Sequence, residues 1–278
     1  MPIDPPVLAQ ELFEAYKTGA EISEPPSRDA AFDLHAAYLT ESALAALRTA
    51  VGSRPVGWKV GYANKAMWRV LKLDTLVWAH MYNETVHYAA NGEANYALGA
   101  ARAPKVEPEI VFRLKTPIAS EGLDAAAALA NVEWLAIGFE VIDCPFPNWQ
   151  VKPTDFVAAF GLHVGLIVGE PMKVEAAAIP ALVEQLAAFK VKVSKNGELV
   201  EEGAGKNSLR SPALCLAELG GAMLRARANA GVENSGRLAA GDLISSGTLT
   251  AGHLAQSGET WRADVEGLPL QALTVHLS

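Results

Sequence analysis

The sequence predicts an α+β protein in which an N-terminal helical segment precedes a longer, strand-rich part. Apolar residues recur at helical spacing in much of residues 1–99, whereas short strand-like runs dominate residues 100–278. Strands and helices do not alternate regularly, which argues against a doubly wound sheet. We therefore expect a mainly helical part over residues 1–99 and a mixed β part over residues 100–278.

The first elements are predicted from spacing and from breaker residues. A helix is expected from Val7 to Tyr16, and a second in the Ala/Leu-rich stretch from Ala30 to Ala50. Glu24-Pro25-Pro26 separates the two helices, and Gly52 is placed to end the second. The run 56–62 then reads as a short strand.

Strand patterns follow Gly99, with two helices among them. Asn196-Gly197 lies between two alternating runs and is a strong hairpin signal. A short Ala-rich helix is expected from Asp124 to Ala130, and a late helix from Pro212 to about Asn229, stopped by Gly231. The expected strands are 110–114, 134–142, 160–168, 189–194, 198–201, 243–249, 260–265 and 270–277.

Composition excludes several classes of function. The 278 residues are 50% hydrophobic, which is ample for a core, and the formal net charge of -8 disfavours nucleic acids and anionic membranes as partners. A small anionic substrate remains possible, because a bound cation or a lysine can reverse the field in one pocket. No signal-peptide or membrane-span pattern occurs, so the cytoplasm is the expected location. Cys144 and Cys215 are expected to be ordinary buried thiols.

Two glutamates at the beginning of a strand form the first candidate site. Glu107 and Glu109 flank Pro108, and residues two apart in an extended chain point to the same face. Their carboxylates repel each other and raise each other's pKa unless a cation compensates. Taken alone, the pair also suits a solvated, charged strand start, because proline favours an edge position.

A third glutamate lies in an apolar run. Glu140 falls within residues 134–142, which are apolar on both faces and therefore predict a buried strand. A buried carboxylate needs an arginine, a lysine, a metal ion or a raised pKa. One interpretation is a salt bridge to a core Arg or Lys. The other is a three-carboxylate site, with Glu107 and Glu109, for a hard divalent cation.

Lys59 is the candidate proton-transfer residue. It lies in the apolar run 56–62, where apolar neighbours can lower the pKa of a lysine and let it act as acid or base. The alternative is a surface lysine whose stem packs while its amine stays in water. Asp143, at the end of the Glu140 strand, is expected to orient a ligand. His163, alone in an apolar strand, is interpreted as a hydrogen-bonded core residue.

The run 245–248 offers hydroxyls and backbone N–H groups to an anionic substrate. Ser246 and Thr248 are the substrate-binding residues predicted from it, although an ordinary strand end with a bulge has the same pattern. No GxGxxG or Walker loop occurs, so no nucleotide cofactor is expected.

Four segments in order resemble the 2-keto-4-pentenoate hydratase/4-oxalocrotonate decarboxylase family of the fumarylacetoacetate hydrolase-like superfamily. These segments are residues 57–61, 106–110, 138–143 and 241–250. The resemblance implies a C-terminal mixed β-roll or sandwich that carries the site. It also implies Mg²⁺ or Mn²⁺ at Glu107, Glu109 and Glu140, with Lys59 as the catalytic lysine.

The chain departs from this family at three places. Relatives have an Asp-x-Pro-Asp-Phe-Gly-like loop where this chain has Asp74-Thr75-Leu76-Val77-Trp78-Ala79. Val77 cannot transfer a proton, so Val77 and Trp78 are predicted to form an apolar wall that favours a monocarboxylate substrate. Arg69 or Arg102 could supply the missing charge. The other departures are Ala158-Ala159 and Arg210-Ser211-Pro212.

The function implied by the resemblance is a metal-dependent lyase. It would add water to a 2-hydroxy-2,4-dienoate or 2-oxo-enoate in the catabolism of aromatic compounds. A decarboxylase of 2-oxo-enedioates is the alternative within the family, and a degenerate subunit that binds a metal or an oxo acid is the alternative outside enzymes. Retention of Lys59 with three glutamates favours an enzyme. The expected partners are a small 2-oxo acid and further copies of the chain in a homo-oligomer.

Overall fold

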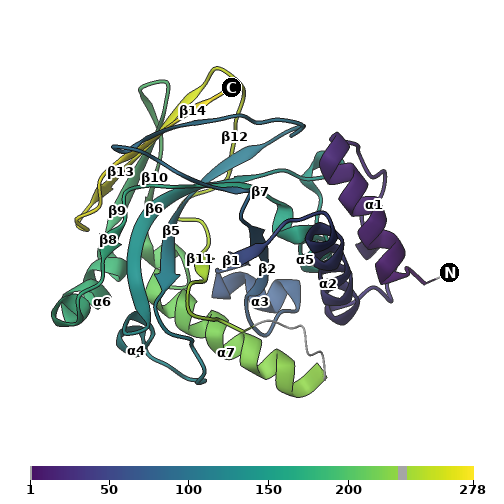
Figure 1. The fold of residues 1–278 in the computed structure, drawn as a ribbon, viewed down its shortest axis with the longest axis horizontal. Coiled ribbons are helices and arrows are strands. Elements are labelled where there is room, and N and C mark those ends of the chain that lie inside the picture. Colours follow the sequence, from purple (N-terminus) through teal and green to yellow (C-terminus); the bar gives the residue numbers. More distant parts are fainter. Residues whose placement is uncertain (1, 231–236) are drawn as a thin grey trace.

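The computed structural model describes residues 2–230 and 237–278, which form helices around two mixed sheets (Figure 1). The α+β class is confirmed. The helices are α1 (Pro5–Thr18), α2 (Leu34–Ala50), α3 (Lys65–Leu71), α4 (Ala125–Leu129), α5 (Pro153–Ala158), α6 (Ile179–Ala188) and α7 (Pro212–Ala230). Short 3₁₀ turns span Pro26–Arg28, Pro147–Trp149, Phe160–Leu162, Ala176–Ala178 and Gly205–Asn207.

The larger sheet has nine strands in the path β2-β1-β11-β5-β6-β7-β3, with β12 beside β5 and β8 beside β6. It is mixed, because β1 runs parallel to β11 and β3 runs parallel to β7 while its other pairs are antiparallel. Its strands are β1 (Pro55–Gly61), β2 (Val77–Tyr82), β3 (Val86–Tyr88), β5 (Lys105–Leu114), β6 (Val132–Ile142), β7 (His163–Val168), β8 (Met172–Lys173), β11 (Leu243–Ser245) and β12 (His253–Leu254).

The smaller sheet has the order β10-β9-β13-β14-β4. Its strands are β4 (Glu93–Tyr96), β9 (Lys190–Lys195), β10 (Glu198–Ala204), β13 (Thr260–Glu266) and β14 (Leu273–Leu277). In Figure 1 this sheet lies at the upper left, whereas α1 and α2 lie at the right and α7 runs below β5 and β11.

The alternation of β5 and β6 positions the site. Glu107 lies opposite Glu140, and Val111 lies opposite Ala136, so all four side chains project from the same face of this strand pair. Val111 and Ala136 belong to a compact apolar cluster on that face, with Met81, Leu166, Val168 and Leu243. The carboxylates therefore lie at the end of an apolar interior rather than on a solvated surface.

Helix boundaries follow from capping groups. Asp33 accepts a hydrogen bond from Ala36 N at 2.9 Å and so begins α2 four residues later than expected from the Ala-rich pattern. Gly19 ends α1 at a φ of 69°, and a Cβ there would lie 2.4 Å from Ala100 O. The expected helix stop at Gly231 lies outside the described residues.

The main strands and the hairpin at Asn196-Gly197 occur as expected, but the division at residue 99 does not follow the sheets. Strands β1 to β4 lie before it, and β1, β3 and β4 pair with β11, β7 and β14 of the later chain. Only about the first 50 residues are mainly helical. Strands β3 and β4, and helices α3 and α6, are too short for sequence periodicity to reveal.

Two expected strands are shorter than predicted because the backbone turns. Gly161 and Leu162 have φ values of 64° and 59°, so β7 begins at His163 rather than at Phe160. Gly247 has a φ of 89° and follows the end of β11 at Ser245. Both turns bring backbone groups to the site described below.

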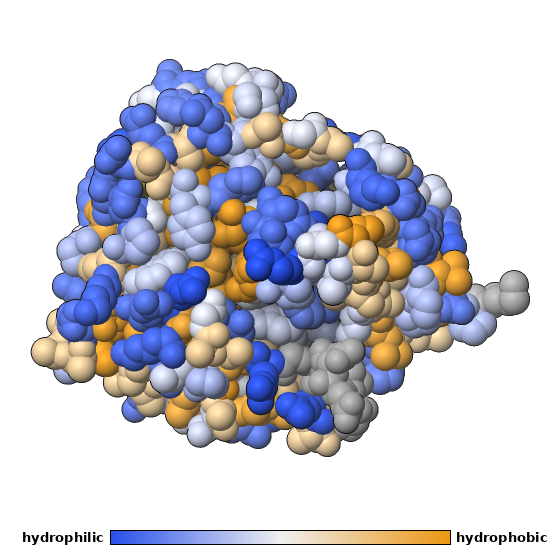
Figure 2. Space-filling view, in the orientation of Figure 1, coloured by the Kyte–Doolittle hydropathy of each residue, from blue (hydrophilic) through white to orange (hydrophobic). Residues whose placement is uncertain are grey.

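Hydrophilic and hydrophobic residues are intermixed on the face shown in Figure 2, with hydrophilic ones along its upper and left rim. Within the described part of the chain, no helix combines the length and the apolar character needed to cross a membrane.

Candidate active site

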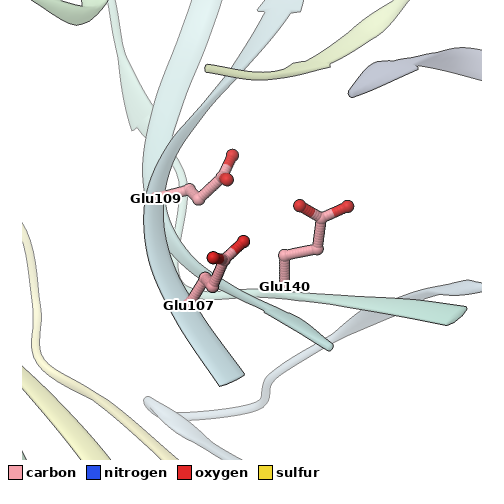
Figure 3. Close-up of side chains that lie close together, drawn as sticks. All are labelled: Glu107, Glu109 and Glu140. Carbon is pink, nitrogen blue, oxygen red and sulfur yellow. The ribbon is translucent and has the colours of Figure 1, made fainter. Parts of the chain in front are cut away.

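Three carboxylates converge from two neighbouring strands. Glu107 and Glu109 extend from β5 and Glu140 extends from β6, with their carboxyl groups turned toward a common space (Figure 3). One oxygen of each lies within 4.8 Å of one from each of the others. Glu109 and Glu140 are buried, whereas Glu107 is partly exposed to the cavity. The structure thus brings together the three predicted metal ligands.

Glu109 is held by the turn after β11. Its Oε2 accepts hydrogen bonds from the Ser245 hydroxyl and, at 2.9 Å, from Gly247 N. Burial and the neighbouring Glu140 nevertheless raise the pKa of Glu109 well above its ordinary value. Burial also raises the pKa of Glu107, to about 7. Without a cation, ionising both groups is therefore unfavourable.

Lys59 faces the same cluster from β1. Its Nζ lies 3.0 Å from Glu140 Oε2, donates to Gly161 O at 2.9 Å, and lies 4.7 Å from the ring centre of Phe156. Burial lowers the pKa of Lys59, but the three carboxylates outweigh it, and the net shift is upward. The expectation that apolar neighbours lower this pKa is therefore wrong, because the sequence does not reveal which charges face the amine. Lys59 is an ammonium group and a proton donor.

Both carboxylate oxygens of Glu140 face a nitrogen-bearing side chain. Its Oε1 lies 2.8 Å from His163 Nδ1, whereas its Oε2 faces Lys59 without a well-aligned hydrogen bond. Burial opposes ionisation, but Lys59 and His163 outweigh it and hold the pKa of Glu140 below its usual value. Of the two interpretations of Glu140, the salt bridge to a core lysine and the three-carboxylate cluster, the structure contains both.

The donor set fits a hard divalent cation. Three carboxylates face one ammonium group, which leaves an excess of negative charge in a largely buried space when all three are ionised. Carboxylate oxygens are the ligands that Mg²⁺ and Mn²⁺ favour. Burial raises the pKa of Glu107 and Glu109, and a bound cation would offset that cost by favouring their ionised forms.

A cavity of about 450 Å³ opens beside the carboxylates. Tyr62 lines it with a φ of 58°, which is uncommon for a residue that is not glycine, and its carbonyl accepts a hydrogen bond from Trp68 Nε1 at 2.7 Å. Burial raises the pKa of Tyr62 to about 12, so its hydroxyl stays protonated. The polar side chains of the lining are Lys59, Tyr62, Asn64, Glu107, Glu109, Glu201, Asn207, Thr248 and Thr250.

Of the predicted residues Thr248, Ser246 and Asp143, only Thr248 lies in the cavity beside the glutamates. Thr248 lines the cavity, but Ser246 does not, and its buried hydroxyl has no hydrogen-bond partner among the described residues. Asp143 accepts hydrogen bonds from Arg102 N and Ala103 N, at 2.8 and 3.0 Å. It therefore anchors the loop before β5 and contacts none of the three glutamates.

Val77 and Trp78 are also absent from the cavity lining. Both are buried in β2, and Trp78 packs against Tyr38 of α2 with ring centres 4.9 Å apart. The argument for an apolar wall at these residues therefore does not apply. The side-chain alternation of a six-residue strand cannot be assigned to a face until its neighbours are known.

Sequence reasoning missed several residues that shape the site. Ser245, rather than Ser246, reaches Glu109. Tyr62, Phe156 and Glu201 line the cavity, and none of them was assigned a role from the sequence. No local signal could have identified Glu201, because it reaches the cavity from the other sheet.

Comparison with known proteins gives concordant matches. A family model described as fumarylacetoacetate (FAA) hydrolase C-terminal matches residues 66–276. A 2-hydroxypent-2,4-dienoate hydratase of Pseudomonas putida is 30% identical over 216 residues, 76% of this chain and 92% of that protein. A 2-hydroxyhexa-2,4-dienoate hydratase of Comamonas testosteroni is 25% identical over 259 residues, 93% of this chain and 92% of that protein.

A solved structure shares the fold. The 4-oxalocrotonate decarboxylase from Pseudomonas putida G7, complexed with magnesium and adipate, aligns with a TM-score of 0.84 at 22% sequence identity. The alignment covers 99% of this chain and 97% of that one. The helices before β1 therefore belong to the shared fold as well as the sheets.

Proposed function

This chain belongs to the fumarylacetoacetate hydrolase C-terminal family, and we propose that it is a divalent-metal-dependent lyase that adds water to a 2-hydroxy-2,4-dienoate. The observation that carries the proposal is the convergence of Glu107, Glu109 and Glu140 beside the buried ammonium of Lys59. The similar hydratases act on substrates of this class by name. A small 2-oxo acid or its enol is therefore the proposed ligand of the cavity.

The three glutamates would hold Mg²⁺ or Mn²⁺. Such an ion supplies Lewis-acid stabilisation to an enolate when it is bound. Neighbouring residues would prepare two of these glutamates for the ion. Ser245 and Gly247 N fix the direction of the Glu109 carboxylate, and Lys59 keeps Glu140 ionised.

Lys59 is the proposed proton-transfer residue. Ketonisation of the dienol removes the proton from its 2-hydroxyl oxygen and places one on C5, which leaves a 2-oxo-3-enoate. Water then adds across C3 and C4, with its oxygen on C4 and its hydrogen on C3. An ammonium group has three N–H bonds, and Gly161 O and Glu140 occupy two directions, so one remains for the substrate.

The cavity favours a hydratase over a decarboxylase of dicarboxylates. Among the described residues of its lining, Lys59 is the only cationic side chain, and Glu140 already pairs with it. Arg102 pairs with Glu21 at 2.5 Å and does not line this cavity, and neither does Arg69. Glu201, whose Oε2 lies 2.6 Å from His253 Nε2, instead adds a carboxylate to the lining, where it would repel a second carboxylate of the substrate.

A decarboxylase stays the second candidate, because the aligned solved structure carries that activity in its name. The two reactions are separated by incubating the purified protein with Mg²⁺ and either 2-hydroxypenta-2,4-dienoate or a 2-oxo-enedioate. Dienol absorbance and mass spectrometry then follow the products. We expect gain of water by the dienoate. Release of CO₂ from the enedioate without hydration of the dienoate would establish the decarboxylase instead, and no turnover of either would indicate a binding subunit.

We predict that kcat/KM is at least about tenfold higher for a monocarboxylate dienoate than for a dicarboxylate of equal length. Leaving a second carboxylate unpaired beside Glu201 costs more than the 1.4 kcal/mol that corresponds to a factor of ten. Glu201→Gln should narrow this preference, whereas Glu202→Gln, on the next and exposed residue of β10, should leave it unchanged. A wild-type preference for the dicarboxylate would contradict the prediction.

We also predict that Mg²⁺ binds more tightly as the pH rises from 6 to 8. The pKa of Glu107 is raised to about 7 and that of Glu109 is raised well above its ordinary value, so protons compete with the metal ion below neutral pH. Calorimetric titration at the two pH values checks this. The increase in Tm caused by Mg²⁺ should likewise be larger at pH 8. Equal affinity at both values would show that these carboxylates are not the ligands.

A further inference from the structure

We propose that His163, supported by Thr85, is a positioning residue that holds the Glu140 carboxylate so that one oxygen stays available to the cation and to Lys59. The proposal rests on the proposed function, because it assigns a partner to one of the three metal-binding glutamates. It also changes the interpretation of His163 from a core residue to a part of the site.

The contacts form a continuous buried chain. His163 Nδ1 lies 2.8 Å from Glu140 Oε1, and His163 Nε2 lies 2.8 Å from Thr85 Oγ1. The exposed fractions of His163, Glu140 and Thr85 are 1%, 0% and 3%. Water therefore cannot replace either hydrogen bond, and the orientation of the imidazole ring is set by its two partners.

The chemistry of the partners determines the direction of each hydrogen bond. A carboxylate only accepts, so His163 Nδ1 carries the hydrogen. In the neutral ring Nε2 is then an acceptor, and the Thr85 hydroxyl lies 2.8 Å from it. The same hydroxyl accepts from Tyr82 N at 3.3 Å and lies 3.0 Å from Tyr82 O, so its proton has both the ring and that carbonyl as acceptors, and the backbone of Tyr82 fixes its position. Thr85 thereby holds the ring at Nε2 while Nδ1–H faces Glu140.

A neutral donor suits this position better than a cation. His163 occupies Oε1 of Glu140 and leaves Oε2 facing Lys59 and the cluster. A second lysine or an arginine there would cancel the negative charge that attracts a divalent ion. A neutral imidazole fixes the carboxylate without that competition.

The turn before β7 and the first residue of β7 contact both Lys59 and Glu140. Gly161 O accepts from Lys59 Nζ at 2.9 Å, two residues before His163 contacts Glu140. Gly161 has a φ of 64°, and a Cβ there would lie 2.5 Å from Lys59 Cδ. The turn therefore requires glycine and fixes Lys59 and Glu140 relative to each other.

The test compares variants of His163 by the dissociation constant for Mg²⁺, measured by calorimetry on the folded full-length chain without substrate. We expect His163→Ala to weaken binding by about 10–100-fold, which is typical for loss of a hydrogen bond to a ligating group. His163→Asn should recover most of the affinity, because its amide N–H can replace Nδ1–H. Thr85→Val should weaken binding less than His163→Ala, and Thr85→Ser should restore it.

Tyr96→Phe is the matched control. It removes a hydrogen bond of 3.1 Å to Val164 O, on the residue of β7 next to His163, without a contact to Glu140. It should bind Mg²⁺ as the wild type does. Wild-type affinity in a folded His163→Ala protein would overturn the proposal, and so would Asn being as poor as Ala. If the alanine variant does not fold, the Asn, Val and Ser variants decide by the same comparison.

The outcomes separate this proposal from the proposed function. Weaker Mg²⁺ binding in His163→Ala, rescued by Asn, in a protein that hydrates no dienoate would refute the function and leave the positioning role in place. If the protein hydrates the dienoate but His163→Ala leaves its Mg²⁺ affinity unchanged, the positioning role would be refuted and the proposed function would stand. A wild-type chain that binds neither Mg²⁺ nor Mn²⁺ would overturn both.

Discussion

Lys59→Met is expected to lower kcat by about 10²–10⁴-fold, the usual contribution of a positioned acid or base. Lys59 is the only cationic side chain in the described lining of the cavity, so no second ammonium group can replace it as the proton donor. Methionine matches the lysine side chain as far as Cε and so still occupies the space beside Gly161. The measurement is steady-state hydration of 2-hydroxypenta-2,4-dienoate with saturating Mg²⁺.

The same variant should bind Mg²⁺ at least as tightly as the wild type. Removing the ammonium 3.0 Å from Glu140 Oε2 leaves the three carboxylates with more negative charge to offer a cation. The combination of lost turnover and kept metal affinity distinguishes proton transfer from a structural role. Lys65→Met, on an exposed lysine of α3 that does not line the cavity, should change neither quantity. Full turnover in Lys59→Met would remove Lys59 from the mechanism.

Glu109→Gln is expected to abolish Mg²⁺-dependent activity and to weaken Mg²⁺ binding by more than the roughly 10–100-fold that loss of an outer partner costs. Glutamine keeps the shape of the side chain and can still accept from Ser245 and Gly247 N through its carbonyl oxygen. It loses the negative charge, which is the property that a hard cation requires. Calorimetry and the hydration assay measure the two effects.

The metal-free Glu109→Gln protein should be more stable than the wild type at pH 8. Because the folded state raises the pKa of Glu109, its ionisation costs stability as the pH rises above the ordinary value of the group. A neutral amide removes that cost, so Tm should rise without Mg²⁺ and should no longer respond to Mg²⁺. Glu133→Gln, on an exposed glutamate of β6, is the control and should keep the wild-type response. A normal Mg²⁺ response in Glu109→Gln would exclude Glu109 as a ligand.

Local patterns sufficed to predict the α+β class and the family, both of which are confirmed. They also placed Glu107 and Glu109 on one face, because alternation along an extended strand follows from backbone geometry alone. The burial of Glu140 was predicted from its apolar neighbours in the same run. Each of these inferences needs only residues that are close in the chain.

Tertiary structure decided which of these residues meet and in what ionisation state. The β5–β6 register places Glu140 opposite Glu107, and the parallel pairing of β1 with β11 places Lys59 beside Ser245. These contacts join distant parts of the chain, so no local pattern could show that Ser245 rather than Ser246 reaches Glu109, or that Trp78 faces α2. A pKa depends on every charge within a few ångströms. For this reason the sequence suggested a lowered pKa for Lys59, whereas the three carboxylates assembled around it raise that pKa.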